Sequence, residues 1–103
     1  MAFITGSHAY GTPNKNSDID VVVRMPAMAA WQLAHQSDSE WTKDPPYPDD
    51  SIQMRFGKLN LICCCKDEVY DNWLEGTSEL VLKKPVTRGE AVATFKRIRE
   101  ENQ

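Results

Sequence analysis

The chain has 103 residues, and at this length it can bury roughly two-thirds of its unfolded surface, which suffices for one modest core and no second domain. Lys and Arg number 12 against 15 Asp and Glu, a net charge of −3, so any polynucleotide partner would need a local basic patch. The sequence has no signal peptide and no apolar run of about 18 residues. We therefore expect one cytoplasmic domain, residues 1–103, that neither crosses nor enters a membrane.

The first half of the chain predicts two strands, a helix and a long loop. An apolar run at residues 2–5 predicts the first strand, and residues 19–24 predict the second. Pro26 suits the first turn of a helix that continues to Gln36. Residues 37–50 are polar and rich in proline, so we expect a loop there, either a functional lid or binding segment or a mobile insertion.

A hairpin that ends in three consecutive cysteines follows. Residues 51–56 and 59–65 predict two strands joined at Gly57-Lys58. Cys63-Cys64-Cys65 lie in the second of these strands, where neighbouring side chains point to opposite faces, so a disulfide among them would be strained. We expect reduced thiols, at least one of them buried, and no zinc site, because the paired spacing of zinc ligands is absent.

Two helices complete the predicted α/β arrangement. Residues 67–75 predict a helix that Asp67 caps and Gly76 stops. Thr87-Arg88-Gly89-Glu90 has the spacing of a capping box, which predicts the start of the last helix. The apolar residues expected to share one face of that last helix are Val92, Phe95 and Ile98.

Two aspartates at the start of the second strand carry the strongest chemical signal. A strand of period two places Asp18 and Asp20 on one face, roughly 6.6 Å apart along the backbone. Two such carboxylates repel each other unless a divalent cation lies between them or one is protonated. We favour the metal, because the turn at Gly6-Ser7 offers backbone N–H groups and a hydroxyl that suit a phosphate. Metal beside phosphate indicates phosphoryl or nucleotidyl transfer.

Each of these features also has a structural interpretation that the sequence leaves open. The two aspartates could form a solvated pair at a strand edge, and His8 either contacts a phosphate or caps the surface. The basic residues that either reach a triphosphate or are ordinary surface charges are Lys15, Arg24, Arg55 and Lys58. The aromatic candidates for stacking on a base, both in the expected long loop, are Trp41 and Tyr47.

The combination of Gly6-Ser7, Gly11 and Ser17-Asp18-Ile19-Asp20 resembles the signature of the DNA polymerase β-like nucleotidyltransferase superfamily. The length and the order of elements look like the small stand-alone nucleotidyltransferases of prokaryotes and their phages, which act in the cytoplasm of the cell or host. The resemblance implies an α/β nucleotidyltransferase fold, a small mixed β-sheet flanked by helices. It also implies two metal ions, Mg²⁺ or Mn²⁺, and transfer of a nucleoside monophosphate from a nucleoside triphosphate, ATP by default.

The resemblance assigns roles to the motif residues. Asp18 and Asp20 would bind the metal, and the nucleotide contacts would come from Gly6, Ser7, Gly11 and Ser17. The acceptor stays open, because a domain of this size has no appended recognition module. A protein, an RNA end and a small molecule such as an antibiotic are all compatible with the motif.

Asn60 stands where the resemblance predicts a third catalytic carboxylate, and we expect it to face the same site as Asp18 and Asp20. An asparagine can offer a neutral oxygen to a metal but cannot accept a proton at neutral pH. Losing a unit charge about 4 Å from a divalent ion weakens its binding by several kcal/mol at an effective dielectric constant near 20. Substrate phosphates could compensate, the domain could be catalytically weak, or another carboxylate could enter from Asp49, Asp50 or Glu68.

Two classes of function therefore remain from the sequence. In the first, the chain is a metal-dependent nucleotidyltransferase. In the second, it is a nucleotidyltransferase-like protein that has lost turnover and binds a nucleotide or a partner protein, as an inhibitor or antitoxin-like module would. Asn60 favours the second class, whereas the intact Asp18 and Asp20 favour the first.

Overall fold

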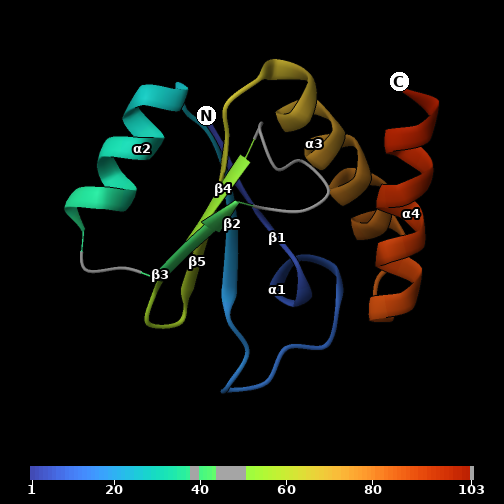
Figure 1. Cartoon of the computed structure of the whole chain (residues 1–103). Coiled ribbons are helices and arrows are strands. Elements are labelled where there is room, and N and C mark those ends of the chain that lie inside the picture. The colour runs from blue at the N-terminus through green and yellow to red at the C-terminus, as the bar shows by residue number, and fades with distance from the viewer. Residues whose placement is uncertain (38–39, 44–50, 103) are drawn as a thin grey trace.

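One mixed sheet of five strands forms the centre of the molecule (Figure 1). The computed structural model describes residues 1–37, 40–43 and 51–102. The strands are β1 (Ala2–Thr5), β2 (Ile19–Arg24), β3 (Glu40–Lys43), β4 (Ser51–Phe56) and β5 (Leu59–Cys64), and their order across the sheet is β1-β2-β5-β4-β3. β2 and β5 run parallel, and the other neighbours are antiparallel, which confirms the expected mixed sheet.

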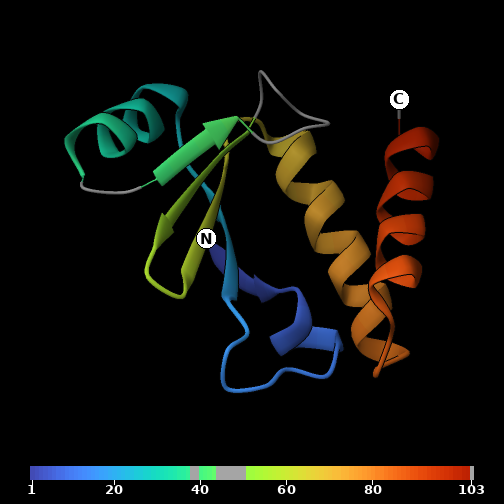
Figure 2. The same cartoon turned by 60° about the horizontal axis from the view of Figure 1, so that its bottom comes forward.

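Helices cover both faces of this sheet. They are α1 (Ser7–Tyr10), α2 (Ala27–Gln36), α3 (Asp67–Leu82) and α4 (Arg88–Glu101). α2 lies on one face and α3 on the other, with α4 packed beside α3 (Figures 1 and 2). Within the described residues, no helix combines the length and the apolar character needed to cross a membrane.

The two faces of the sheet have separate apolar cores, because successive residues of a strand point to opposite sides. Ile62 and Cys64 of β5 face α3, whereas Cys63 between them faces α2. The core under α3 consists of Val22, Ile62, Cys64, Val69 and Tyr70. The core under α2 consists of Ala30, Ala34, Ile52, Met54 and Cys63. A third cluster, made of Tyr10, Leu80, Val86 and Ala91, joins α1 to α3 and α4.

The segment predicted as one continuous loop, residues 37–50, contains strand β3. This strand pairs antiparallel with β4, from Glu40 opposite Arg55 to Lys43 opposite Ile52. A short edge strand gains its hydrogen bonds from the neighbouring strand, so the local composition gives little sign of it. The rest of the expected lid at residues 37–50 lies largely outside the described residues, namely residues 38–39 and 44–50, which include Tyr47, Asp49 and Asp50.

Helix α3 does not stop at Gly76, as the sequence predicts, but continues through it to Leu82. Asp67 is its first helical residue rather than its cap, since Lys66 occupies the cap position without a side-chain hydrogen bond. A Cβ atom on Gly76 would lie 2.4 Å from Cε1 of Phe95 on α4. The glycine therefore serves close packing between α3 and α4 and does not terminate the helix.

Replacing Gly76 with alanine should destabilise the fold. Alanine ordinarily gains about 1 kcal/mol over glycine in a helix. Here the added methyl group meets the Phe95 ring, and overpacking of this kind costs about 1–3 kcal/mol, so the net free energy of unfolding should fall. Gly89→Ala on α4 is the control, because its Cβ would meet nothing closer than 3.9 Å and should be neutral or stabilising. Urea unfolding measures both, and stabilisation by Gly76→Ala would contradict the packing.

The start of α4 has the predicted cap. The Thr87 hydroxyl accepts a hydrogen bond from the backbone N–H of Glu90 at 3.2 Å and contacts the Glu90 carboxylate at 3.1 Å. Ile98 is buried and Phe95 packs against the third cluster, as expected. Val92, however, is 59% exposed, so the predicted apolar face is shorter than the sequence suggests, and Ala91 is buried in its place.

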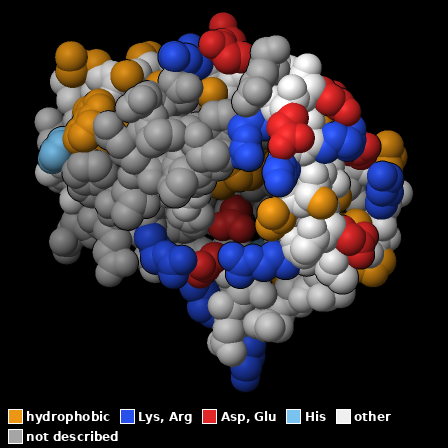
Figure 3. All heavy atoms as spheres, turned by 45° about the vertical axis from the view of Figure 1, so that its right-hand side comes forward, with side chains coloured by type: hydrophobic (Ala, Val, Ile, Leu, Met, Phe, Trp, Pro, Cys, Tyr) orange, Lys and Arg blue, Asp and Glu red, His pale blue; other side chains and the backbone are white. Residues whose placement is uncertain are grey.

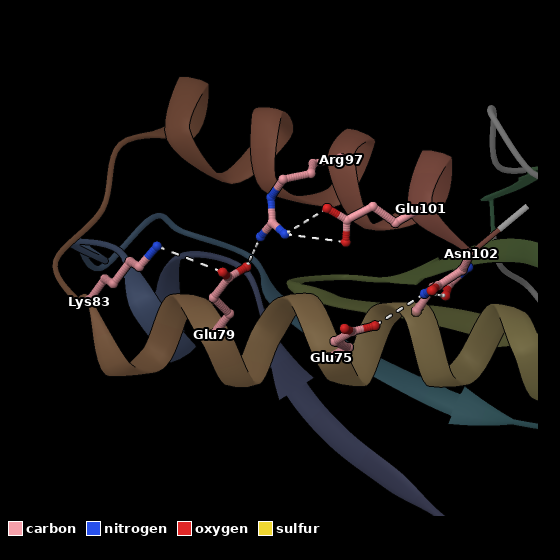
Figure 4. Close-up of polar contacts among 7 residues, drawn as sticks. Glu75, Glu79, Lys83, Arg97, Glu101 and Asn102 are labelled. Carbon is pink, nitrogen blue, oxygen red and sulfur yellow. Dashed lines mark hydrogen bonds and ion pairs between the residues drawn. The ribbon is translucent and has the colours of Figure 1, made fainter.

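Polar side chains line the outer seam between α3 and α4 (Figure 4). Arg97 of α4 pairs with Glu79 of α3 and, at 3.3 Å, with Glu101 on its own helix. Asn102 donates to Glu75 of α3 at 3.1 Å. Exposed ion pairs contribute about 0–1 kcal/mol, so the apolar contacts provide most of the attachment of α4 and the polar seam fixes its orientation.

The three cysteines should differ in reactivity. None of them forms a disulfide, Cys63 and Cys64 are buried, and Cys65 is partly exposed. Burial, with a smaller contribution from Cys65, raises the pKa of Cys63 to about 11, so little of its reactive thiolate exists at neutral pH. A thiol reagent should label Cys65 in the native protein and the other two on unfolding. Equal labelling rates for all three would contradict the buried strand.

Candidate functional site

Backbone register brings four polar residues into one row across the sheet. Thr5 of β1, Asp20 of β2, Asn60 of β5 and Arg55 of β4 are successive pairing partners. Directly paired residues point to the same face of a sheet, and Asp18 precedes Asp20 by two positions. Sequence segments far apart in the chain are thereby assembled on the face that α3 covers.

This row opens into a cavity of about 720 Å³ between the sheet and α4. Its charged lining residues within the described chain are Asp18, Asp20, Arg55 and Arg88. The space-filling view has acidic side chains in and beside a hollow, with basic side chains on its rim (Figure 3). The site is therefore acidic at its floor and basic at its edge, an arrangement that suits a metal bound together with an anionic ligand.

Asp20 is a half-buried carboxylate whose pKa is raised above the ordinary value. Burial is the largest cause, and the nearby charge of Asp18 acts in the same direction. A hydrogen bond from Asn60 and the charge of Arg55 oppose this rise in pKa without cancelling it. The ionised carboxylate is thus incompletely compensated by the protein, which is the electrostatic situation that a cation would relieve.

Asn60 lies in the site, where it interacts through its amide nitrogen. Nδ2 donates to Oδ1 of Asp20 at 3.1 Å and to Oε1 of Gln53 at 3.3 Å. The ionised Asp20 carboxylate offers acceptor oxygens only, which orients the Asn60 amide with its NH₂ group toward it. In this arrangement Asn60 supports the ionised form of Asp20 rather than presenting an oxygen to a metal.

The Gly6-Ser7 turn lies directly against the Asp20 carboxylate. Gly6 has a φ angle of 73°, and a Cβ atom there would lie 2.2 Å from Oδ2 of Asp20. Its carbonyl accepts hydrogen bonds from the amides of Ala9 and Tyr10 at 2.9 and 3.1 Å. Only a glycine combines this backbone conformation with this approach, so the turn and the carboxylate are built as one unit.

The remaining motif residues hold the segment between α1 and β2. The N–H of Gly11 donates to the Ser7 carbonyl at 3.0 Å, and Ser17 Oγ accepts from the Asn14 amide at 3.0 Å. His8 Nε2 lies 3.4 Å from the Ser17 carbonyl oxygen, and its side chain is exposed. Gly11 and Ser17 line the cavity, but the hydrogen bonds of Ser17 and His8 serve the loop.

Of the four basic residues named from the sequence, Arg55 alone lines the cavity. Its Nη2 pairs with Oδ2 of Asp18 at 2.8 Å. Arg24 instead pairs with Asp67 at 2.8 Å, at the opposite end of β2. The Lys58 ammonium donates to the carbonyl oxygen of Lys15 at 2.5 Å, away from the cavity lining.

Glu68 does not replace the missing third carboxylate. It follows Asp67, whose partner Arg24 ends β2, whereas Asp20 lies near the start of that strand. Among the described residues, Glu68 is not part of the cavity lining.

Several residues of the cavity were not among the site residues expected from the sequence. These are Gln53 on β4, Trp73 on α3, and Arg88 and Phe95 on α4. The position of Gln53 could have been expected from the two-residue hairpin at Gly57-Lys58. This turn sets the register that brings β4 alongside Asn60. The contribution of α4 depends on its packing against α3, where the rings of Trp73 and Phe95 lie 4.9 Å apart, and no local pattern reveals it.

The described part of the cavity offers a divalent cation two carboxylates. Within the described chain no cluster of three or more His, Cys, Asp or Glu side chains is suited to a metal, and the acidic side chains that line the cavity are Asp18 and Asp20. Mg²⁺ commonly binds through one or two carboxylates together with substrate phosphates and water. The pair therefore fits a metal that arrives with a phosphorylated ligand.

The mixed sheet, with Asp20 against the Gly6-Ser7 turn and Asp18 in the same cavity, is the arrangement that the sequence resemblance to nucleotidyltransferases predicts. A family model described as a nucleotidyltransferase domain matches residues 1–80, and the chain belongs to this family. The family's general chemistry is nucleotidyl transfer with a nucleoside triphosphate as substrate. Searches of curated proteins and of solved structures find no match to the chain. The whole of α4, with its cavity residues, lies beyond the matched region.

Proposed function

We propose that this chain is a metal-dependent nucleotidyltransferase that moves a nucleoside monophosphate from ATP to an acceptor group. The observation that carries the proposal is the contact between the Gly6-Ser7 turn and the Asp20 carboxylate, with Asp18 in the same cavity. A turn suited to phosphate and a pair of carboxylates suited to metal meet at one point. Family membership supplies the class of reaction that such a point serves.

In this function Asp18 and Asp20 would hold Mg²⁺ or Mn²⁺, which would neutralise charge at the α-phosphate. Gly6 and Ser7 would bind the β- and γ-phosphates through the turn. An acceptor oxygen attacks the α-phosphorus as the bond to the bridging oxygen of the β-phosphate breaks. Pyrophosphate leaves with that electron pair, and the acceptor proton passes to solvent. The electrostatic balance favours one metal bound with the nucleotide.

A second candidate, a nucleotidyltransferase-like protein that binds a nucleotide or a partner protein without turnover, is favoured by one observation. Asn60 offers amide hydrogens to Asp20 and Gln53, so it neither adds charge for a second metal nor acts as a general base. Such a protein would bind a metal–nucleotide complex through the same residues and release it unchanged.

We further propose that residues 1–103 act as one domain, since the α4 residues beyond the family match line the same cavity as Asp20.

The catalytic proposal is tested by incubating the protein with each nucleoside triphosphate labelled at the α-phosphate, Mg²⁺ or Mn²⁺, and total cell extract. Label should appear on a protein, an RNA or a small molecule, and not with an Asp20→Asn variant. Retention of all label in unreacted nucleotide, with tight nucleotide binding, would support the second candidate instead.

A further inference from the structure

Arg55 reaches across the sheet to form an ion pair with Asp18. Arg55 lies on β4, where it pairs with Asn60 of β5, and Asp18 lies just before β2. Strand β5 therefore lies between the two residues in the sheet. The side chains of Arg55 and Asp18 together span roughly 10 Å, about two strand spacings, and place Nη2 2.8 Å from Oδ2. The Arg55 side chain is 52% exposed, so it is attached to the site by its charge rather than by packing.

This ion pair gives Asp18 a cation before any metal binds. A divalent ion that enters alone must displace the guanidinium from one of its two carboxylate ligands, or share the carboxylate with it against charge repulsion. A nucleoside triphosphate changes this balance, since its phosphates offer Arg55 a new anionic partner. Guanidinium groups bind phosphate oxygens through two parallel hydrogen bonds. The ion pair with Asp18 is a single contact, from Nη2 at 2.8 Å, so a phosphate could offer Arg55 more hydrogen bonds than Asp18 does.

We propose that Arg55 is a built-in counter-cation that exchanges Asp18 for the phosphates of the incoming nucleotide. The inference rests on the proposed nucleotide-binding function and adds an order of events to it. Without nucleotide, Arg55 forms its ion pair with Asp18 and keeps the affinity of the site for free metal low. With nucleotide, Arg55 binds phosphate and releases Asp18, so metal and nucleotide enter as one complex. Arg55 is thereby a substrate-binding residue that also makes metal binding depend on substrate.

The exchange predicts effects of opposite sign in one variant. Arg55→Gln should bind Mn²⁺ alone about tenfold more tightly, because the competing charge is gone. It should bind ATP with Mg²⁺ about tenfold more weakly, because a phosphate contact is lost. Electron paramagnetic resonance of free Mn²⁺ measures the first affinity and calorimetry the second. Arg55→Lys retains a cation near Asp18 and should stay close to the wild type in Mn²⁺ affinity.

Arg88→Gln is the matched control, because it removes the same charge from the same cavity without breaking the Asp18 pair. Its affinity for Mn²⁺ alone should change by less than about twofold. Unchanged or weaker Mn²⁺ binding by Arg55→Gln, or equal tightening by Arg88→Gln, would overturn the proposal. So would full ATP affinity in Arg55→Gln. Asp18→Asn distinguishes a failure of the exchange from a failure of the nucleotide site. If this variant loses metal-dependent ATP binding while Arg55→Gln gives one of the contradicting results, the nucleotide site is supported and only the exchange is rejected.

Discussion

The Asp18→Asn, Asp20→Asn double variant should lose Mg²⁺-dependent nucleotide binding by about 100-fold or more while remaining folded. Both carboxylates line the cavity, and within the described residues no other acidic side chain does, so neutral amides leave a divalent ion without a charged protein ligand. Calorimetry with ATP, with and without Mg²⁺, measures the loss. An Asp67→Asn variant, altered at the far end of β2, is the control and should bind like the wild type. Unchanged affinity in the double variant would reject the site.

The same pair predicts a pH dependence of stability through Asp20. Its folded-state pKa is raised, chiefly by burial, so the folded protein holds this proton more tightly than the unfolded chain. Stability should therefore fall as pH rises from the ordinary aspartate pKa through the folded value. Asp20→Asn removes this loss, so its melting temperature should exceed that of the wild type at pH 7 and the difference should shrink below about pH 4. A constant difference across this range would contradict the assignment.

Asn60→Asp should make the stability of the protein depend strongly on metal. The new carboxylate would stand about as close to Asp20 as the Asn60 amide, at 3.1 Å, and would lose both donated hydrogen bonds. Without metal, repulsion should lower the melting temperature by several degrees. With Mg²⁺ the added charge should tighten binding by about tenfold or more and restore the lost stability. Thermal unfolding in EDTA and in Mg²⁺ measures both effects.

A matched control variant shows whether the effect of Asn60→Asp is specific to the site or follows from the loss of any amide donor. Asn102→Asp also removes a donor to a carboxylate, that of Glu75, but on the outer seam between α3 and α4. Its melting temperature should be the same in EDTA and in Mg²⁺. For Asn60→Asp, a rise in nucleotidyl transfer would identify a weakened enzyme. Tighter metal binding without transfer would favour the binding protein, and unchanged metal affinity would contradict the place of Asn60 in the site.

The sequence predicts most of the sheet because its signals are local. The apolar runs of β1 and β2, the Gly57-Lys58 turn and the alternation of β5 each lie within a few residues. The short edge strand β3 was not predicted, because its stability comes from pairing with β4 rather than from its own composition. The role of Gly76 is equally hidden from the local sequence. Its role depends on Phe95, which is 19 positions away in the sequence and adjacent in space.

The candidate site divides along the same line. Asp18, Asp20 and the Gly6-Ser7 turn form a compact motif, and the period of β5 was enough to orient Asn60 toward them. The ion pair of Arg55 with Asp18 requires strand order and register, which one sequence does not determine. The wall formed by α4 requires knowing which side of α3 this helix packs against, a tertiary choice with no local pattern.

Nucleotidyl transfer by this protein is tested by comparing transfer from ATP labelled at the α-phosphate with transfer from ATP labelled at the γ-phosphate. Both reactions contain the protein, Mg²⁺ and the same cell extract, and the Asp20→Asn variant is run beside the wild type. If the protein transfers a nucleotidyl group at this site, the wild type alone should transfer the α-label to an acceptor and release the γ-label as pyrophosphate. Transfer of the γ-label to the acceptor, or equal transfer by Asp20→Asn, would contradict nucleotidyl transfer at this site.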